Sequence, residues 1–281
     1  MQAKVDFITP HITDAHFLEY PCFKPGFACE LELPQWAPIH LGPLTIDISP
    51  TKHVVMLWIA AILVLLTLLT AARAHKKQSA TIGRSKGFAN GIEALVLYIR
   101  QEVVLPNVGH HGERYAPFVL TLFFFILFAN LLGLIPYGST ATGNISVTAT
   151  LAVISFFMIE LAGIRAQGVG YLKTIVYWPS DQPVVMKAFL TPIMTPIEIF
   201  GKFTKPIALA IRLFANMTAG HIVVLALLGL IFTFGSYVIA PLPLLMALAI
   251  MVLEVFIGFL QAYVFALLVS VFIGLIREGA H

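Results

Sequence analysis

Charged residues are scarce in this chain of 281 residues: Asp, Glu, Lys and Arg make up 11% of it, and 59% is hydrophobic. Soluble domains carry about 25% charged residues. A net charge of only +3 excludes a nucleic-acid-binding protein built on a basic face, and the apolar content excludes disorder. Residues 115–159 contain no charged side chain, which suits two membrane crossings of about 20 residues each. We therefore expect an all-α integral membrane protein.

Several chemical motifs are also missing. There is no P-loop for nucleotide chemistry, and there is no HExxH or paired GxGD-type aspartate of an intramembrane protease. No internal repeat supports the inverted-repeat architecture of secondary transporters. The two cysteines, Cys22 and Cys29, fit neither a CxxC pair nor a zinc site. The sequence is compatible with a disulfide between them and with two free thiols. We expect no cofactor and no bound metal.

The first apolar run covers residues 53–72. Five cations follow it within fourteen residues: Arg73, Lys76, Lys77, Arg84 and Lys86. The positive-inside rule places this loop in the cytoplasm and the head, residues 1–50, outside. Acidic residues occur throughout the head, so it lacks the sequence pattern of a cleavable signal peptide. Residues 91–105 are too short to cross, contain three charges and stop at Pro106, which predicts an amphipathic helix on the membrane surface.

The charge-free stretch supplies two further crossings, residues 117–134 and 145–164, joined by the polar turn PYGSTATGN. Arg165, Lys173 and Lys187 follow and return the chain to the cytoplasm, in agreement with the first orientation. We group residues 51–190 as peripheral helices. The five cations after the first crossing would either contact helices of a partner or lie in a solvated loop.

The last third, residues 191–281, is expected to hold two long helices. Pro192, Pro196 and Pro206 mark its beginning, before an apolar run over residues 207–234. The second run, residues 244–276, would be about 50 Å long as one helix, whereas the hydrocarbon core is about 30 Å thick. An unbroken helix must then tilt by roughly 50°, beyond the usual range; the alternative is a kink at Gly258 or Gly274.

Three ionisable residues stand inside these apolar runs: Arg212, His221 and Glu254. Placing such groups at membrane depth costs free energy, so they indicate function by default. The structural alternative is an internal ion pair between helices. Arg212 and Asn216 share one helical face, and His221 lies about 180° around from Arg212. Glu254 and Gln261 line one face of the last helix. A fixed guanidinium charge together with titratable His and Glu side chains suits proton transport.

Three sequence blocks carry a family resemblance. KPIALAIRLFANMTAGHIV (205–223) and LEVFIGFLQAYVFALLVSVFI (253–273) resemble subunit a of the F-type ATP synthase, and ANLLGLIPY (129–137) is similar to a second signature of that family. The resemblance covers the chain from about residue 45 onward. It implies a stationary, non-catalytic subunit that forms two offset aqueous half-channels beside a rotating ring of c subunits, passes protons to the ring carboxylates and couples the proton-motive force to ATP synthesis.

The resemblance also assigns roles to residues. Arg212 matches the essential arginine that faces the ring carboxylates, Asn216 matches the polar residue one turn later, and Gln261 matches the glutamine of the last helix. Glu198 and Lys205 match polar positions at the cytoplasmic end of the preceding helix. Asn130 resembles a polar lining residue, and contact between helices is an equally good interpretation.

Two departures from the family pattern stand out. In the best-studied bacterial members an acid occupies the position of His221 and a histidine that of Glu254, so the pair is exchanged here as in mitochondrial-type members. This exchange suggests that both side chains serve one half-channel. Gly133 stands where some relatives carry an acid, so we place no relay carboxylate there.

The sequence thus predicts a multi-pass subunit of an energy-transducing membrane, most simply the bacterial inner membrane, with the N-terminus outside and the C-terminus cytoplasmic. Its expected partners are the c-ring, b-type peripheral-stalk subunits, lipid and the translocated proton, with no nucleic acid and no directly bound nucleotide. The alternative is a stand-alone proton or cation transporter or channel, which would conduct without a ring.

Overall fold

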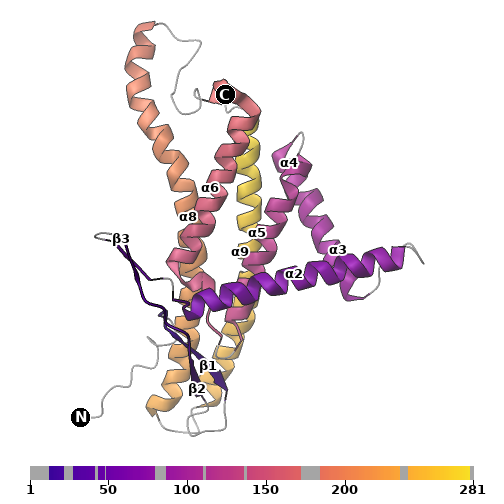
Figure 1. Ribbon diagram of the computed structural model, residues 1–281, viewed down its shortest axis with the longest axis vertical. Coiled ribbons are helices and arrows are strands. Elements are labelled where there is room, and N and C mark those ends of the chain that lie inside the picture. Colours follow the sequence, from indigo (N-terminus) through magenta and orange to yellow (C-terminus); the bar gives the residue numbers. More distant parts are fainter. Residues whose placement is uncertain are drawn as a thin grey trace. The chain divides into compact units, whose positions relative to one another are not determined.

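Helices dominate the part of the chain that the structure describes. The computed structural model describes residues 13–21, 28–41, 44–47, 49–79, 87–109, 112–135, 138–171, 184–234 and 240–278. Within these ranges five helices are long and apolar enough to cross a membrane (Figure 1). They are α2 (Lys52–Ser79), α5 (Ala116–Gly133), α6 (Ile145–Gln167), α8 (Val184–Phe234) and α9 (Pro241–Glu278). The expectation of a helical membrane protein is confirmed.

The first three of these helices follow the apolar runs closely. α2 continues seven residues beyond the predicted end of the first run, because residues 73–79 include Ala, Arg, Lys and Gln, which are good helix formers. α5 and α6 each lie within three residues of the predicted crossings. Between them the described part of the polar turn forms the short 3-10 helix η3 (Ala141–Gly143).

The last two helices are longer than their apolar runs. α8 has 51 residues and contains all three prolines that the sequence places at its beginning, so these residues do not end the helix. Each proline lacks an N–H and therefore leaves one carbonyl of the preceding turn without its helical partner. α9 has 38 residues, about 57 Å at 1.5 Å per residue, and it continues through Gly258 and Gly274 without interruption, so no helix break occurs there.

The segment predicted as a single helix over residues 91–105 consists of several helical pieces. It consists of α3 (Phe88–Tyr98), the π-helix η1 (Ile99–Val104) and α4 (Leu105–Val108). Pro106 does not end it, because proline is tolerated in the first turn of α4. α4 also packs against α9: a Cβ added at Gly274 would overlap the carbonyl oxygen of Asn107, so glycine is required for this close approach.

The N-terminal head contains strands that the sequence did not predict. β1 (Phe17–Pro21) pairs antiparallel with β2 (Ala28–Glu32), with Phe17 opposite Glu32. β3 (Ile39–Leu41) pairs antiparallel with β4 (Leu44–Ile46). Cys22 lies outside the described residues, so the pairing of the two cysteines stays a prediction.

The chain divides into two units, each drawn from three stretches of sequence. The first unit comprises Met1–Leu69, Phe124–Val147 and Leu213–Gln261, and the second comprises Thr70–Phe123, Thr148–Arg212 and Ala262–His281. Buried residues of the first unit include Ile126, Leu213 and Met217. Those of the second include Val103 and Ile273.

Candidate functional site

A buried histidine at the start of α2 connects the head to the polar turn in the first unit. His53 is only 3% exposed, and its Nε2 atom is hydrogen-bonded to the Ser139 hydroxyl at 3.1 Å. On its other side, His53 Nδ1 lies 2.7 Å from Oδ1 of Asp14, which is partly exposed. Burial alone would raise the pKa of Asp14, but the charge of His53 and hydrogen bonds from Thr51 and His53 lower it below its usual value.

The polar turn continues this connection toward α8. Thr140, the neighbour of Ser139, is hydrogen-bonded through its hydroxyl to Nε2 of His221. Thr218, one turn before His221, donates to the Gly143 carbonyl at 3.4 Å. A series of polar side chains therefore runs from Asp14 through His53, and then through the two adjacent hydroxyl residues, to His221.

Glu254 lies next to the end of this series. The carboxyl group is buried, at 5% exposure, and its Oε1 atom accepts no hydrogen bond from the described residues. It lies against Gly220, the neighbour of His221: a Cβ at Gly220 would overlap Oε1 and would come within 2.8 Å of Cδ. No hydrogen bond or ion pair joins Glu254 directly to His221 among the described contacts. A buried oxygen without a partner is typical of sites that water or a proton donor reaches.

Asn130 uses both ends of its amide to join protein segments. It is fully buried in α5, donates to the Gly258 carbonyl of α9 at 3.1 Å and accepts a hydrogen bond from the Thr142 hydroxyl at 2.7 Å. This geometry matches the helix-contact interpretation of Asn130. Nearby, a Cβ at Gly133 would overlap the Thr140 side chain, so the site leaves no space for a carboxylate at that position.

Arg212 and Asn216 both lie on the exposed side of α8. Leu213 and Met217, roughly 100° and 140° around the helix from Arg212, are buried, and His221, further around in the same direction, contacts the turn. Ile207 and Ile211 are each more than half exposed beside Arg212. Within the described residues Arg212 forms no ion pair. Gln261, on α9, is buried.

The second unit contains a separate polar cluster beside Glu198. Lys202 Nζ lies 3.6 Å from Oε2 of Glu160 and donates to the Tyr171 hydroxyl at 2.9 Å, and that hydroxyl in turn donates to Glu160. These Lys202 and Glu160 side chains line a cavity of about 120 Å³ together with the exposed Glu198 and with Lys205. Lys205 Nζ lies 5.0 Å from the centre of the Phe272 ring.

Sequence reasoning missed several of these residues, namely Asp14, His53, Ser139, Thr140, Glu160, Tyr171 and Lys202. One signal was present: Glu160 is an ionisable residue inside the predicted crossing 145–164, and the rule that selected Arg212 selects it too. Hydroxyl residues of a turn carry no comparable signal. Among the described residues no group of three His, Cys, Asp or Glu side chains could hold a metal ion.

Apolar helices of this length, with ionisable side chains placed within them, define a multi-pass helical membrane protein. The family model for the ATP synthase A chain matches residues 54–274. ATP synthase subunit a of Chloroherpeton thalassium is 48% identical over 266 residues, which cover 94% of this chain and 74% of that protein. The protein of the same name from Myxococcus xanthus is 48% identical over 239 residues, 84% of this chain and 76% of that protein.

ATP synthase subunit a 2 of Chlorobaculum tepidum is 47% identical over 275 residues, 96% of this chain and 72% of that protein. The chain belongs to the ATP synthase subunit a family. It is a non-catalytic subunit of the membrane-embedded Fo sector, and the resemblance inferred from its sequence blocks is confirmed.

Proposed function

We propose that this chain is the proton-translocating stator of its ATP synthase and that Arg212 faces the carboxylates of a rotating c-ring. The observation that carries the proposal is an exposed guanidinium on an apolar helix with no ion-pair partner among the described residues. A charge at membrane depth is stable only when it is paired or hydrated. A carboxylate from a neighbouring subunit supplies such a partner.

The inlet half-channel, in this proposal, uses the polar series of the first unit. Protons from outside the cell pass from Asp14 and His53 by way of Ser139 and Thr140 to His221 and then to Glu254. The distances between the paired atoms and the burial of His53 support this route. Asn130 positions α5 on α9 beside it, and Gln261 and Asn216 complete the polar lining near the ring.

The outlet half-channel uses the cavity of the second unit that Glu198 lines. Glu198, Lys202 and Glu160 line that cavity, and the Tyr171 hydroxyl connects the last two. Four of its lining side chains are charged and favour water in the cavity, so a proton released near Arg212 can leave toward the cytoplasm.

The chemistry follows from the cost of burying charge. A ring carboxylate that has taken up a proton is neutral and can move through lipid, whereas its ionised form would pay a large desolvation penalty. Near Arg212 the ionised form is favoured, and the proton leaves. Because a guanidinium does not release its own proton, it also prevents direct flow between the half-channels. Each proton that falls through 100 mV yields about 2.3 kcal/mol.

The proposed setting is the bacterial inner membrane, with the N-terminus outside, the C-terminus in the cytoplasm and residues 191–281 toward the ring. The cations at the end of α2 support this orientation by the positive-inside rule, and the relatives described above come from bacteria. Peripheral-stalk subunits of the b type are the proposed partners of the peripheral helices in residues 51–190.

The test is the variant Arg212→Ala in membrane vesicles that contain the whole complex. We expect proton-driven ATP synthesis to be lost while the c-ring still copurifies, and the control Arg73→Ala, an exposed cation at the end of α2, to keep full synthesis. Persistent synthesis by Arg212→Ala would refute the proposal. Proton conduction by the purified subunit without a ring would favour the stand-alone channel instead.

A further inference from the structure

A second cavity of the second unit lies where three membrane spans end. It encloses about 560 Å³ and is lined by Glu113, Arg114, Tyr115, Arg165, Ala166 and Arg277. Glu113 to Tyr115 immediately precede the span Ala116–Gly133, Arg165 and Ala166 belong to the last turn of the span Ile145–Gln167, and Arg277 ends the span Pro241–Arg277. The cavity therefore lies at the depth of the lipid headgroups of one leaflet.

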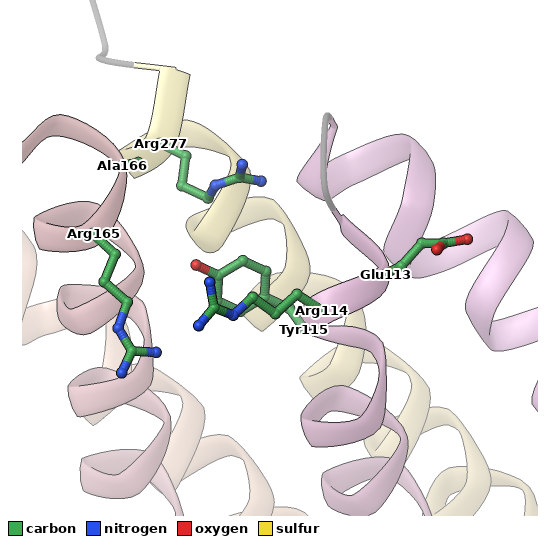
Figure 2. Close-up of a pocket in the computed structure, with 6 residues that line it drawn as sticks. All are labelled: Glu113, Arg114, Tyr115, Arg165, Ala166 and Arg277. Carbon is green, nitrogen blue, oxygen red and sulfur yellow. The ribbon is translucent and has the colours of Figure 1, made fainter.

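The lining of this cavity is strongly cationic. Figure 2 shows the Arg114 and Arg165 side chains extending toward the same space, with Arg277 above them. Glu113 does not neutralise them, because its carboxylate is turned away and pairs with Arg100 at 2.7 Å. Neither Arg114 nor Arg165 forms an ion pair with any residue that the structure describes.

Arg277 and Tyr115 form the fixed part of the site. The Arg277 guanidinium lies 5.4 Å from the centre of the Tyr115 ring and donates to the Val108 carbonyl at 3.0 Å. Tyr115 itself is buried, at 7% exposure. These contacts hold one guanidinium in place at the cavity, so its position does not depend on a ligand.

We propose that this cavity binds the phosphate group of an anionic phospholipid. Arginine forks match phosphate oxygens in bidentate hydrogen bonds, and basic pockets between membrane helices on the cytoplasmic side suit such headgroups. The cavity is also much larger than a single phosphate group needs, and next to Arg165 the exposed Ile164 and, one turn deeper, Leu161 provide an apolar surface for an acyl chain.

The test measures binding of fluorescent phosphatidylglycerol to the delipidated whole complex in a neutral detergent. We expect saturable binding that fluorescent phosphatidylcholine does not reproduce. In the double variant Arg114→Gln/Arg165→Gln the affinity should fall about thirtyfold, because each arginine near an anionic lipid contributes about a fivefold gain. Both side chains are exposed, so their replacement leaves the packed interior unchanged. The control Arg73→Gln removes an exposed cation at the end of another span and should bind like the wild type.

Competition with inorganic phosphate distinguishes a lipid headgroup from free phosphate as the anion that the cavity binds. Competition by phosphate only at concentrations far above those of the lipid supports a lipid site, because the acyl chains then add affinity. Binding of phosphate without selective binding of phosphatidylglycerol would overturn the lipid assignment. Equal affinities of the double variant Arg114→Gln/Arg165→Gln and the wild type for phosphatidylglycerol, with intact assembly, would overturn the site itself. The charge-preserving variant Arg114→Lys/Arg165→Lys should bind more tightly than the glutamine variant and less tightly than the wild type, because lysine keeps the charge and loses the bidentate fork.

Discussion

Glu254 of α9 lies directly against Gly220 of α8, and its carboxyl group fills the space that a Cβ at Gly220 would occupy. The residue next to Gly220 is His221, whose ring is held by Thr140. The glycine thus permits a titratable side chain from one long helix to reach the backbone of the other beside the histidine.

The variant Gly220→Ala tests this contact. The added methyl group must displace the Glu254 carboxyl, which is the mobile end of a flexible side chain, so we expect a destabilisation near the lower end of the roughly 1–3 kcal/mol that overpacking costs. Proton-driven ATP synthesis should nevertheless fall severalfold, because the carboxyl leaves its position beside His221. The matched control is Gly229→Ala on the same helix, where a Cβ meets no atom within 4 Å. Equal ATP synthesis rates in the two variants would contradict the prediction.

A second prediction concerns Asp14 and pH. Its pKa in the folded protein is lowered from the usual 3.8, so ionised Asp14 stabilises the fold above that pH, and the contribution is lost as the pH falls through the lowered value. Asp14→Asn should therefore lower the melting temperature of the complex near neutral pH, and the difference from the wild type should shrink in acid. Glu32→Gln, in the same head, is the control. A difference that is independent of pH down to acid unfolding would disprove the role of the Asp14 charge.

A third prediction concerns the buried amide of Asn130. Asn130→Leu leaves the Gly258 carbonyl and the Thr142 hydroxyl without their partner, and hydrogen bonds between membrane helices contribute on average about 0.6 kcal/mol each. We expect a loss of about 1 kcal/mol in the free energy of unfolding. Thr142→Val removes only one of the two bonds and should cost about half as much. The double variant should cost less than the sum of the single ones, because the residues share a bond; strict additivity would show that the bond contributes nothing.

The sequence predicted the number and type of the membrane helices because apolar length alone determines them. It predicted that Arg212 and His221 lie on opposite faces of one helix, because helical phase depends only on the spacing of residues within that helix. It could not predict that α8 begins before Pro192, since the cost of a proline is offset only by tertiary context. Nor could it predict the short strands of the head, which are too brief to show a hydrophobic period.

The contacts of the polar series were beyond sequence reasoning for a different reason. His53 and Ser139 are 86 residues apart, and Thr140 and His221 are 81 apart. Helical phase relates residues within one element, but only tertiary packing brings a particular serine to a particular histidine. Glu160 differs, because its place inside an apolar span was readable, whereas its partners Tyr171 and Lys202 were not.

The final prediction concerns the exchanged pair itself. If His221 and Glu254 serve one inlet half-channel, the protein needs one imidazole and one carboxyl group there, and their order along the path is of less consequence. His221→Glu and Glu254→His should each abolish most proton flux, because each leaves two groups of one kind. The double exchange restores one of each, so proton uptake into vesicles, driven by ATP hydrolysis, should recover above both single variants. Recovery will be partial, because Thr140 is placed to bond an imidazole at position 221 and Gly220 leaves space for a carboxyl rather than a ring at position 254. Equal loss in all three variants, with the ring still bound, would show that the two side chains act in separate paths.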